Sequence, residues 1–111
     1  MGQPPPPALL PGTLDLLILK ALAPGSHHGY GIAQRLRTMS GDVLEVGESS
    51  RYPALQRLLL KGWTKAEWGT SENNRRARFD TLTAAGRKQL VVERAEFDRL
   101  IFAIHTVLNT T

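Results

Sequence analysis

The sequence predicts a mostly α-helical domain with one small β-hairpin, an α+β fold. Apolar residues recur at helical spacing in four segments, and a stretch of alternating polarity lies between the third and the fourth. Glycine, proline or capping residues separate these segments. The chain has 111 residues, of which 41% are hydrophobic and 22% charged, so it is long enough for one folded domain with its own core.

The N-terminal part predicts an arm followed by a first helix. Residues 1–8 include four consecutive prolines, which lack backbone N–H groups and favour a flexible, polyproline-like arm. Thr13 is a suitable helix cap, and Asp15 then lies in the first turn, where its charge suits the helix dipole. Pro24 and Gly25 end this helix. Its apolar face consists of Leu14, Leu17, Ile18, Ala21 and Leu22.

Two further helices follow. The second covers about residues 30–39, and an extended piece, residues 43–48, separates it from the third. The third helix begins at a cap, Ser49 or Ser50, and ends at Lys61 before a glycine. A proline then falls in the first turn, where its missing N–H has no partner to lose. The apolar side consists of Leu55, Leu58 and Leu59, and the proline is Pro53.

The next stretch predicts a hairpin and a long final helix. Residues 63–68 and 76–82 alternate in polarity as strands do, and the turn-rich residues 69–74 join them. Thr83 caps a helix that runs to about Leu108.

The final helix carries an apolar stripe that repeats every seven residues. Leu90, Phe97 and Ile104 form the repeat, and Ile101 and Leu108 lie between them. A core this small does not cover a stripe of that length, so we expect part of it to pack on a second subunit. Packing against the first helix of the same chain is the alternative.

Three short helices followed by a hairpin is the arrangement of a winged helix-turn-helix domain. In such domains the third helix enters the major groove of DNA, while the hairpin, or wing, reaches the adjacent backbone or minor groove. We therefore divide the chain into the arm (1–8), a winged helix-turn-helix DNA-binding domain (9–83) and a C-terminal dimerisation helix (84–108). Because winged helices also bind proteins, a protein-interaction module without DNA binding is the alternative.

Basic residues are concentrated in one part of the chain. Residues 51–88 contain nine basic and three acidic residues in a chain whose net charge is +4, so the remainder is slightly acidic. Such asymmetry indicates a polyanionic partner, and double-stranded DNA fits the predicted layout.

The third helix and the wing carry the basic residues that we expect to contact DNA. Ser50, Arg57 and Lys61 are expected to share one exposed stripe with Ala54 between them, and Gln56 beside the stripe can read an adenine. An ordinary solvated helix face is the alternative. The wing adds three arginines, which suit phosphates or a narrow minor groove, although a solubility role is also open. They are Arg75, Arg76 and Arg78, and they follow the small polar residues Thr70, Ser71, Asn73 and Asn74.

Other functions find no support in the sequence. The absence of cysteine excludes disulfides, thiolate metal sites and a cysteine nucleophile. No set of nucleophile, base and orienting group emerges, so we expect neither an enzyme nor a cofactor. His27 and His28 are adjacent and His105 is distant, which argues against a metal site. The N-terminus lacks the residue order of a signal peptide, and residues 14–23 are too short to span a bilayer, so we expect a cytoplasmic protein with no membrane partner.

Four motifs follow one another along the chain: LLPGTLD at residues 9–15, HGYGI at 28–32, YPAL at 52–55 and LTAAG at 82–86. In this order they resemble the motifs of the PadR family of bacterial transcriptional regulators, and the resemblance covers about residues 9–108. The stretch EWGTSENNRRA at 67–77 is similar to the wing of a short subgroup that has a single C-terminal helix.

The resemblance implies a homodimeric winged-helix repressor. Its third helix would read operator DNA, and its first and last helices would form the dimer interface. Two-fold symmetry then predicts a pseudo-palindromic operator with half-sites about 10 bp apart. By position, Ser50, Tyr52 and Pro53 match the start of the family's recognition helix, Arg75 and Arg76 its wing, and Gly29 and Tyr30 the start of its second helix, which lies against the DNA backbone.

Some members of the family are released from DNA by small aromatic or cationic inducers bound near the dimer interface. A ligand-responsive sensor is therefore a further alternative, and Phe97, Leu100, Ile101 and Ile104 are the candidates to line its pocket.

The chain departs from the family's pattern at several positions. Arg51 stands where an apolar residue is usual, Thr64 where a branched aliphatic is usual, and Asp80 where a second aromatic residue of the wing is usual. We expect Arg51 either to add a DNA contact or to pack its stem inward with its charged end at the surface.

Two sets of site residues follow. Basic members of the first set neutralise phosphates, while Ser50, Arg51 and Gln56 read base edges in the major groove. The expected DNA contacts are Gly29, Tyr30, Ser50, Arg51, Tyr52, Pro53, Gln56, Arg57, Lys61, Asn73, Asn74, Arg75, Arg76 and Arg78. The expected dimer contacts are Leu14, Leu17, Ile18, Leu90, Phe97, Leu100, Ile101, Ile104 and Leu108.

Overall fold

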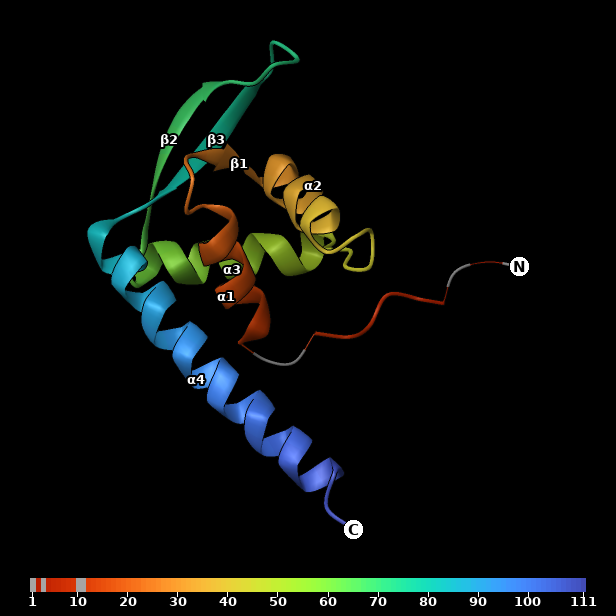
Figure 1. Cartoon of the computed structure of the whole chain (residues 1–111). Coiled ribbons are helices and arrows are strands. Elements are labelled where there is room, and N and C mark those ends of the chain that lie inside the picture. Colours follow the sequence, from red (N-terminus) through yellow and green to blue (C-terminus); the bar gives the residue numbers. More distant parts are fainter. Residues whose placement is uncertain (1, 3, 10–11) are drawn as a thin grey trace.

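The computed structural model describes residues 2, 4–9 and 12–111, and within them the predicted α+β fold is confirmed (Figure 1). Parts of the expected arm (Met1 and Gln3) and of the first motif (Leu10 and Pro11) lie outside the described residues. The elements in chain order are α1 (Thr13–Ala21), β1 (His27–His28), α2 (Gly29–Met39), α3 (Glu48–Leu60), β2 (Thr64–Thr70), β3 (Arg76–Leu82) and α4 (Ala84–Leu108).

The core lies where α1, α2 and α3 meet the base of the sheet. Side chains of all three helices fill it, and Leu82 of β3 closes it on the sheet side. Ile18, Leu19, Leu22, Ile32 and Leu58 are its largest fully buried apolar side chains.

Helix α1 begins one residue earlier than a Thr13 cap would place it. Gly12 is the N-cap, with a positive φ of 84°, and Thr13 is the first helical residue. A glycine suits this position because a side chain strains the left-handed backbone. Asp15 lies in the first turn as predicted, but it is buried.

Strand β1 makes the sheet three-stranded instead of a lone hairpin. It pairs antiparallel with β3, which also pairs with β2, so the strand order is β1-β3-β2. A strand of two residues is too short to show an alternating pattern, and for this reason the sequence did not reveal it. His28 also caps α2, because its Nδ1 accepts a hydrogen bond from the Gly31 N–H at 3.0 Å, and its ring packs edge-on against Phe79.

Helix α3 begins two or three residues earlier than predicted. Gly47 is its N-cap, so neither Ser49 nor Ser50 caps it. Pro53 is therefore the sixth helical residue and not a first-turn residue. It cannot donate to the carbonyl of Ser49, which weakens the hydrogen bonding of this end of the helix. The extended piece expected at 43–48 forms no strand, and its last residue belongs to the helix.

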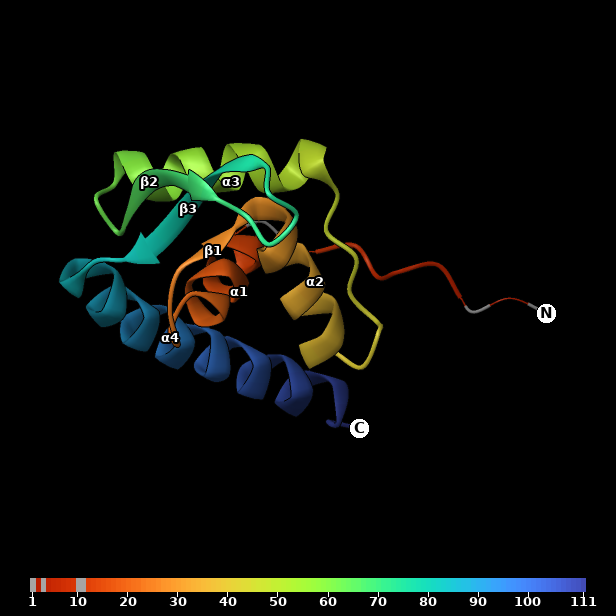
Figure 2. The same cartoon turned by 90° about the horizontal axis from the view of Figure 1, so that it is seen from above.

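The hairpin and α4 are joined by the predicted cap. The Thr83 hydroxyl accepts a hydrogen bond from the Gly86 N–H at 3.0 Å and donates one to the Gly62 carbonyl at 2.7 Å. Helix α4 then extends along α1 and beyond the body of the molecule (Figures 1 and 2). Gly86 is its only buried residue.

Candidate nucleic-acid interface

A cleft of about 340 Å³ lies between the start of α2, the first half of α3 and the wing, by which we mean the β2–β3 hairpin. It brings together five of the expected DNA contacts from three separate parts of the chain. These five residues are Gly29, Tyr30, Arg51, Tyr52 and Arg78. His28, Glu48, Leu55, Trp68, Ala77 and Asp80 complete its lining.

Three aromatic side chains around this cleft are more than half exposed. Tyr30, Tyr52 and Trp68 expose 62%, 56% and 64% of their surfaces. Exposed aromatic side chains beside basic ones are suited to contacts with sugars, phosphates and bases. Sequence reasoning missed Trp68. This residue lies opposite Arg78 in the strand pair, and Arg76 is two residues from Arg78 on the same strand, so all three side chains share one face of the hairpin.

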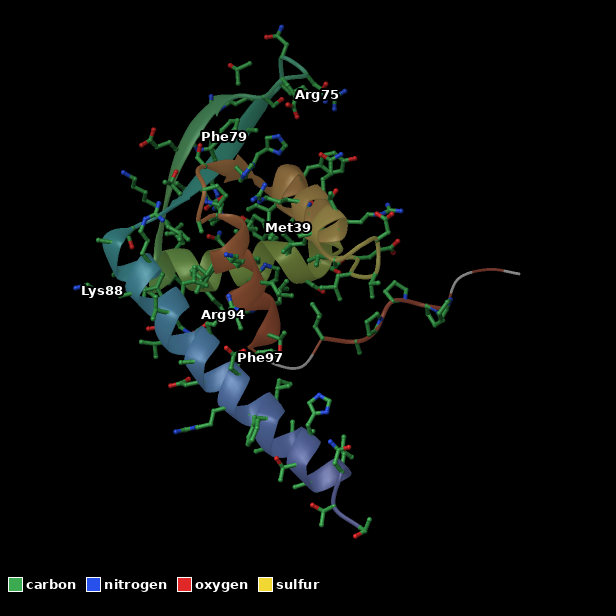
Figure 3. The ribbon with its side chains drawn as sticks, viewed as in Figure 1. Met39, Arg75, Phe79, Lys88, Arg94 and Phe97 are labelled. Carbon is green, nitrogen blue, oxygen red and sulfur yellow. The ribbon has the colours of Figure 1, made fainter. Side chains whose placement is uncertain are left out.

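The wing tip holds its arginines on a well-defined turn. The Asn74 N–H donates to the Ser71 carbonyl at 2.9 Å, and the Ser71 N–H donates to the Arg75 carbonyl at 2.8 Å. Asn74 adopts a positive φ of 58°, which asparagine tolerates better than most residues. Arg75 projects at the tip (Figure 3), and Arg76 stacks over the Trp68 ring, 4.8 Å from its centre. Asn73, Asn74, Arg75 and Arg76 are all exposed.

A line of polar contacts connects α3 with β3 at the edge of the cleft. Gln56 Nε2 donates to Tyr52 Oη at 3.2 Å, and Arg78 Nη1 donates to Gln56 Oε1 at 3.3 Å. Arg78 Nη2 lies 3.4 Å from Asp80 Oδ1 in an ion pair that lacks hydrogen-bond geometry. We call these four residues the polar chain.

Asp80 is the buried end of the polar chain. Only 1% of the residue is exposed, and within the described part of the protein neither carboxylate oxygen has a hydrogen-bond partner. Burial raises the pKa of Asp80, and the neighbouring Arg78 opposes that rise. Sequence reasoning noticed Asp80 only as a departure from a family pattern.

Arg51 packs its stem inward, which was the second of the two possibilities expected for it, and its charged end contacts the protein itself. Its Nη1 donates to the Val46 carbonyl at 3.3 Å, so the guanidinium reaches back to the loop before α3. Its stem passes the Cα of Gly29, where a Cβ would lie 3.1 Å from Arg51 Nε. A glycine at this position therefore lets α2 and α3 approach closely.

Arg57 lies on a different side of α3 from the cleft. It pairs with Asp15 of α1, at 2.7 Å from Nη2 to Oδ1 and 3.3 Å from Nε to Oδ2. The hydrogen bond to Asp15 raises the pKa of Arg57. Arg57 and Ser50 line a groove with arm residues Pro6 and Pro7.

The expected exposed stripe on α3 holds for Ser50, Arg57 and Lys61, which are exposed, and is wrong for Ala54. Ala54, which was placed between its members, is fully buried, because the stripe faces α1 over part of its length. Lys61 lies at the C-terminal end of α3 and stacks over Trp63, 4.7 Å from the ring centre. Pro53 is exposed on the first half of the helix.

The expected dimer contacts fall into two groups. Ile18 is fully buried and Leu14 nearly so, and both are reassigned to the core because a residue enclosed within its own subunit is not available to a partner. Leu17 and Leu90 are half-buried against that core. The others lie along α4, half-buried or exposed: Phe97, Leu100, Ile101, Ile104 and Leu108.

Helix α4 exposes further apolar side chains besides the expected dimer contacts. Val91, Phe102 and Val107 each expose at least 70% of their surface. A groove of about 260 Å³ lies between the start of α1 and α4, and Phe97 and Leu100 line it together with Glu93 and Glu96.

The described residues form neither a membrane-spanning helix nor a metal-binding cluster. None of the helices in this part of the chain is long and apolar enough to cross a membrane. Among the same residues no cluster of histidine and carboxylate side chains could hold a metal ion.

Comparison with known proteins identifies similar regulators. A model of the family described as the transcriptional regulator PadR-like family matches residues 18–92. A transcriptional regulator from Clostridium thermocellum is similar, with a TM-score of 0.78 and 26% identity over 86% of this chain and 92% of that one. A PadR family transcription regulator from Clostridium difficile gives a TM-score of 0.75 and 25% identity over 88% of this chain and all of that one.

One similar structure contains DNA. Bacillus subtilis PadR in complex with operator DNA is similar with a TM-score of 0.62 and 26% identity. The match covers 70% of this chain and 44% of the Bacillus subtilis chain.

Proposed function

This chain belongs to the PadR-like family of transcriptional regulators, and we propose that it represses transcription by binding double-stranded operator DNA as a homodimer. The observation that carries the proposal is the gathering of α2, α3 and the wing around one cleft, which exposed tyrosines rim and the half-buried Arg51 and Arg78 line. The Bacillus subtilis relative in complex with operator DNA supports the choice of partner. The matching family model describes transcriptional regulators.

In this proposal, α3 is the recognition helix and its first half enters the major groove. Tyr52 and Ser50 are exposed there, and Arg51 would leave the Val46 carbonyl to reach a base edge. Gly29 and Tyr30 would bring the start of α2 against the DNA backbone.

The wing supplies most of the charge in the proposed contact. Arg75 and Arg76 are exposed at a tip that the Ser71 and Asn74 hydrogen bonds hold in shape, so little ordering is needed when they meet phosphates or the minor groove. Arg57 and Lys61 contribute less charge to the proposed contact. Asp15 already pairs with Arg57, and Lys61 lies at the far end of α3.

The proposed homodimer is supported by α4. A helix of 25 residues with one buried residue exposes too much apolar surface for a lone subunit. A two-fold dimer through α1 and α4 covers this surface and presents two recognition helices to half-sites about one helical turn apart. In this arrangement residues 1–8 are the arm, 9–83 bind DNA and 84–108 dimerise.

Selection of bound duplexes from a random library tests the proposal. We expect a pseudo-palindromic sequence that the protein shifts in a mobility assay, and repression of a reporter placed behind it. Failure to enrich any duplex, with the folded protein confirmed by circular dichroism, would contradict DNA binding.

A small-molecule inducer site is a second candidate, favoured by one observation. The groove between α1 and α4 places the carboxylates of Glu93 and Glu96 beside the Phe97 ring, a combination that suits an aromatic cation. Titration with a panel of aromatic cations is expected to lower DNA affinity for at least one compound, and phenolic acids serve as the control of opposite charge. No change with any compound would remove this candidate.

A further inference from the structure

We infer that Gln56 is a positioning residue that fixes the wing to the recognition helix, and that it does not read a base. The inference rests on the proposed function for its DNA part, and on the polar chain for its structural part. It reverses the expectation that Gln56 would recognise an adenine.

Both ends of the Gln56 amide are already engaged. Reading an adenine requires Oε1 as an acceptor and Nε2 as a donor at the same time. In the structure Oε1 accepts from Arg78 and Nε2 donates to Tyr52. Turning the amide towards a base would break both contacts and take from Arg78 its only hydrogen-bond acceptor among the described residues.

The positive charge of Arg78 is paired with the buried carboxylate of Asp80. The Arg78 side chain is 19% exposed, and it pairs with Asp80, whose side chain is 1% exposed. A buried carboxylate opposite a guanidinium neutralises it locally, so Arg78 adds little to the attraction for phosphates. Arg78 therefore belongs with Gln56 as a positioning residue, unlike Arg75 and Arg76 at the tip.

The polar chain spans the two elements that meet DNA. Gln56 and Arg78 are 22 residues apart in sequence, and their hydrogen bond joins α3 directly to β3. Tyr52 is the exposed end of the polar chain and lines the cleft. Loss of the polar chain would let the wing and α3 move relative to each other. This movement would weaken every DNA contact and would not change the preference for any one base.

Four variants test the inference: Gln56→Ala, Arg78→Ala, the double variant, and Arg75→Ala as a control that removes a tip arginine of the same charge. In the DNA arm, we expect Gln56→Ala to lower affinity about tenfold for the selected operator and for its single-base variants alike. Arg78→Ala should do the same without changing the slope of log affinity against log salt. Arg75→Ala should reduce that slope by about one per subunit.

In the free-protein arm, urea unfolding of the same variants measures coupling. The midpoint shifts of Gln56→Ala and Arg78→Ala are expected to be non-additive, because each variant breaks the same hydrogen bond. Additive shifts would overturn the inference. So would a change of base preference confined to one operator position in Gln56→Ala, or a reduced salt slope in Arg78→Ala. A parent protein that binds no duplex would contradict the proposed function, while the unfolding measurement would still decide whether the polar chain couples α3 to the wing.

Discussion

Among single residues, Asp80 is a buried carboxylate whose ionised form lowers the stability of the folded protein. Desolvation raises its pKa despite the nearby Arg78, so the folded protein binds a proton at this site more tightly than the unfolded chain does. A stabilising contribution is therefore present in acid and lost as the pH rises from the ordinary value of 3.8 through the folded-state pKa. The position of Asp80 behind Arg78 gives a reason to keep it.

Replacing the carboxyl by an amide should separate stability from function. We expect Asp80→Asn to raise the urea midpoint at pH 7, because the amide does not ionise, and we expect the difference from the parent to shrink as the pH falls towards 4. DNA affinity should fall in the same variant, because the ion pair no longer holds Arg78 in position beside Gln56. Unfolding followed by tryptophan fluorescence at both pH values measures the first effect, and a variant less stable than the parent at pH 7 would contradict it.

Gly86 is the residue at which added volume should do most harm. A Cβ there would overlap the carbonyl oxygen of Trp63, where α4 leaves the sheet. We expect Gly86→Ala to destabilise the protein by about 3 kcal/mol, since backbone on both sides must move. Ala85→Ser, at an exposed neighbouring position, is the control, and thermal unfolding measures both. Equal melting temperatures of Gly86→Ala and the parent would disprove the close approach.

Among the helices and strands, those that a regular apolar spacing or a side-chain cap marks were predicted from the sequence. The long fourth helix, its Thr83 cap and strand β3 are confirmed. Strand β1 has two residues and depends on pairing with β3, so no local pattern could reveal it. The start of α3 was missed because Gly47 caps it without a side-chain signal.

The candidate site was predictable in its residue types and less so in its contacts. Arginines at the wing and aromatic residues at helix starts are visible in the chain. The partners that engage them are not, because Asp15 is 42 residues from Arg57, and Asp80 reaches Arg78 only in the folded sheet. Long-range pairing of this kind leaves no mark in local spacing.

The Arg57–Asp15 pair joins α1 to α3, and its loss should be felt in stability more than in DNA binding. Asp15 has a side chain only 10% exposed, so Arg57→Ala leaves a nearly buried carboxylate without its cation. Because Arg57 itself is half-exposed, we expect a loss of about 1–2 kcal/mol. The double variant Asp15→Asn/Arg57→Ala should recover part of it in urea unfolding. A stability unchanged in Arg57→Ala, together with a large loss of DNA affinity, would contradict this assignment.

At the scale of the whole molecule, the extended shape of the chain supports the proposed homodimer. Its radius of gyration is 15.5 Å, whereas a compact domain of this length has a value of about 13 Å. Residues 4–9 and α4 extend from the body (Figure 1), and α4 exposes Leu100, Val107 and Leu108. A second copy packed along α4 would cover this surface.

A charge placed on the apolar side of α4 should dissociate the dimer without unfolding the subunit. Ile104 is 38% exposed in the lone subunit, so Ile104→Asp is compatible with its fold. We expect dimer affinity at least about a hundredfold weaker, because the interface would bury an unpaired carboxylate. Thr106→Asp, on the opposite side of the same helix, is the control. Sedimentation velocity distinguishes the two, and a dimeric Ile104→Asp would contradict the proposed interface.

The most direct test of the account is the affinity of the parent protein and of Arg75→Ala/Arg76→Ala for one selected duplex, measured from low to high salt with the stoichiometry determined at saturation. We expect two chains per duplex, an affinity for the parent that falls steeply with salt, and a log–log slope smaller by about 3 to 4 in the variant, because two arginines are lost from each of two subunits. One chain per duplex, or a slope that is the same in both proteins, would contradict a dimer that holds DNA through its wings.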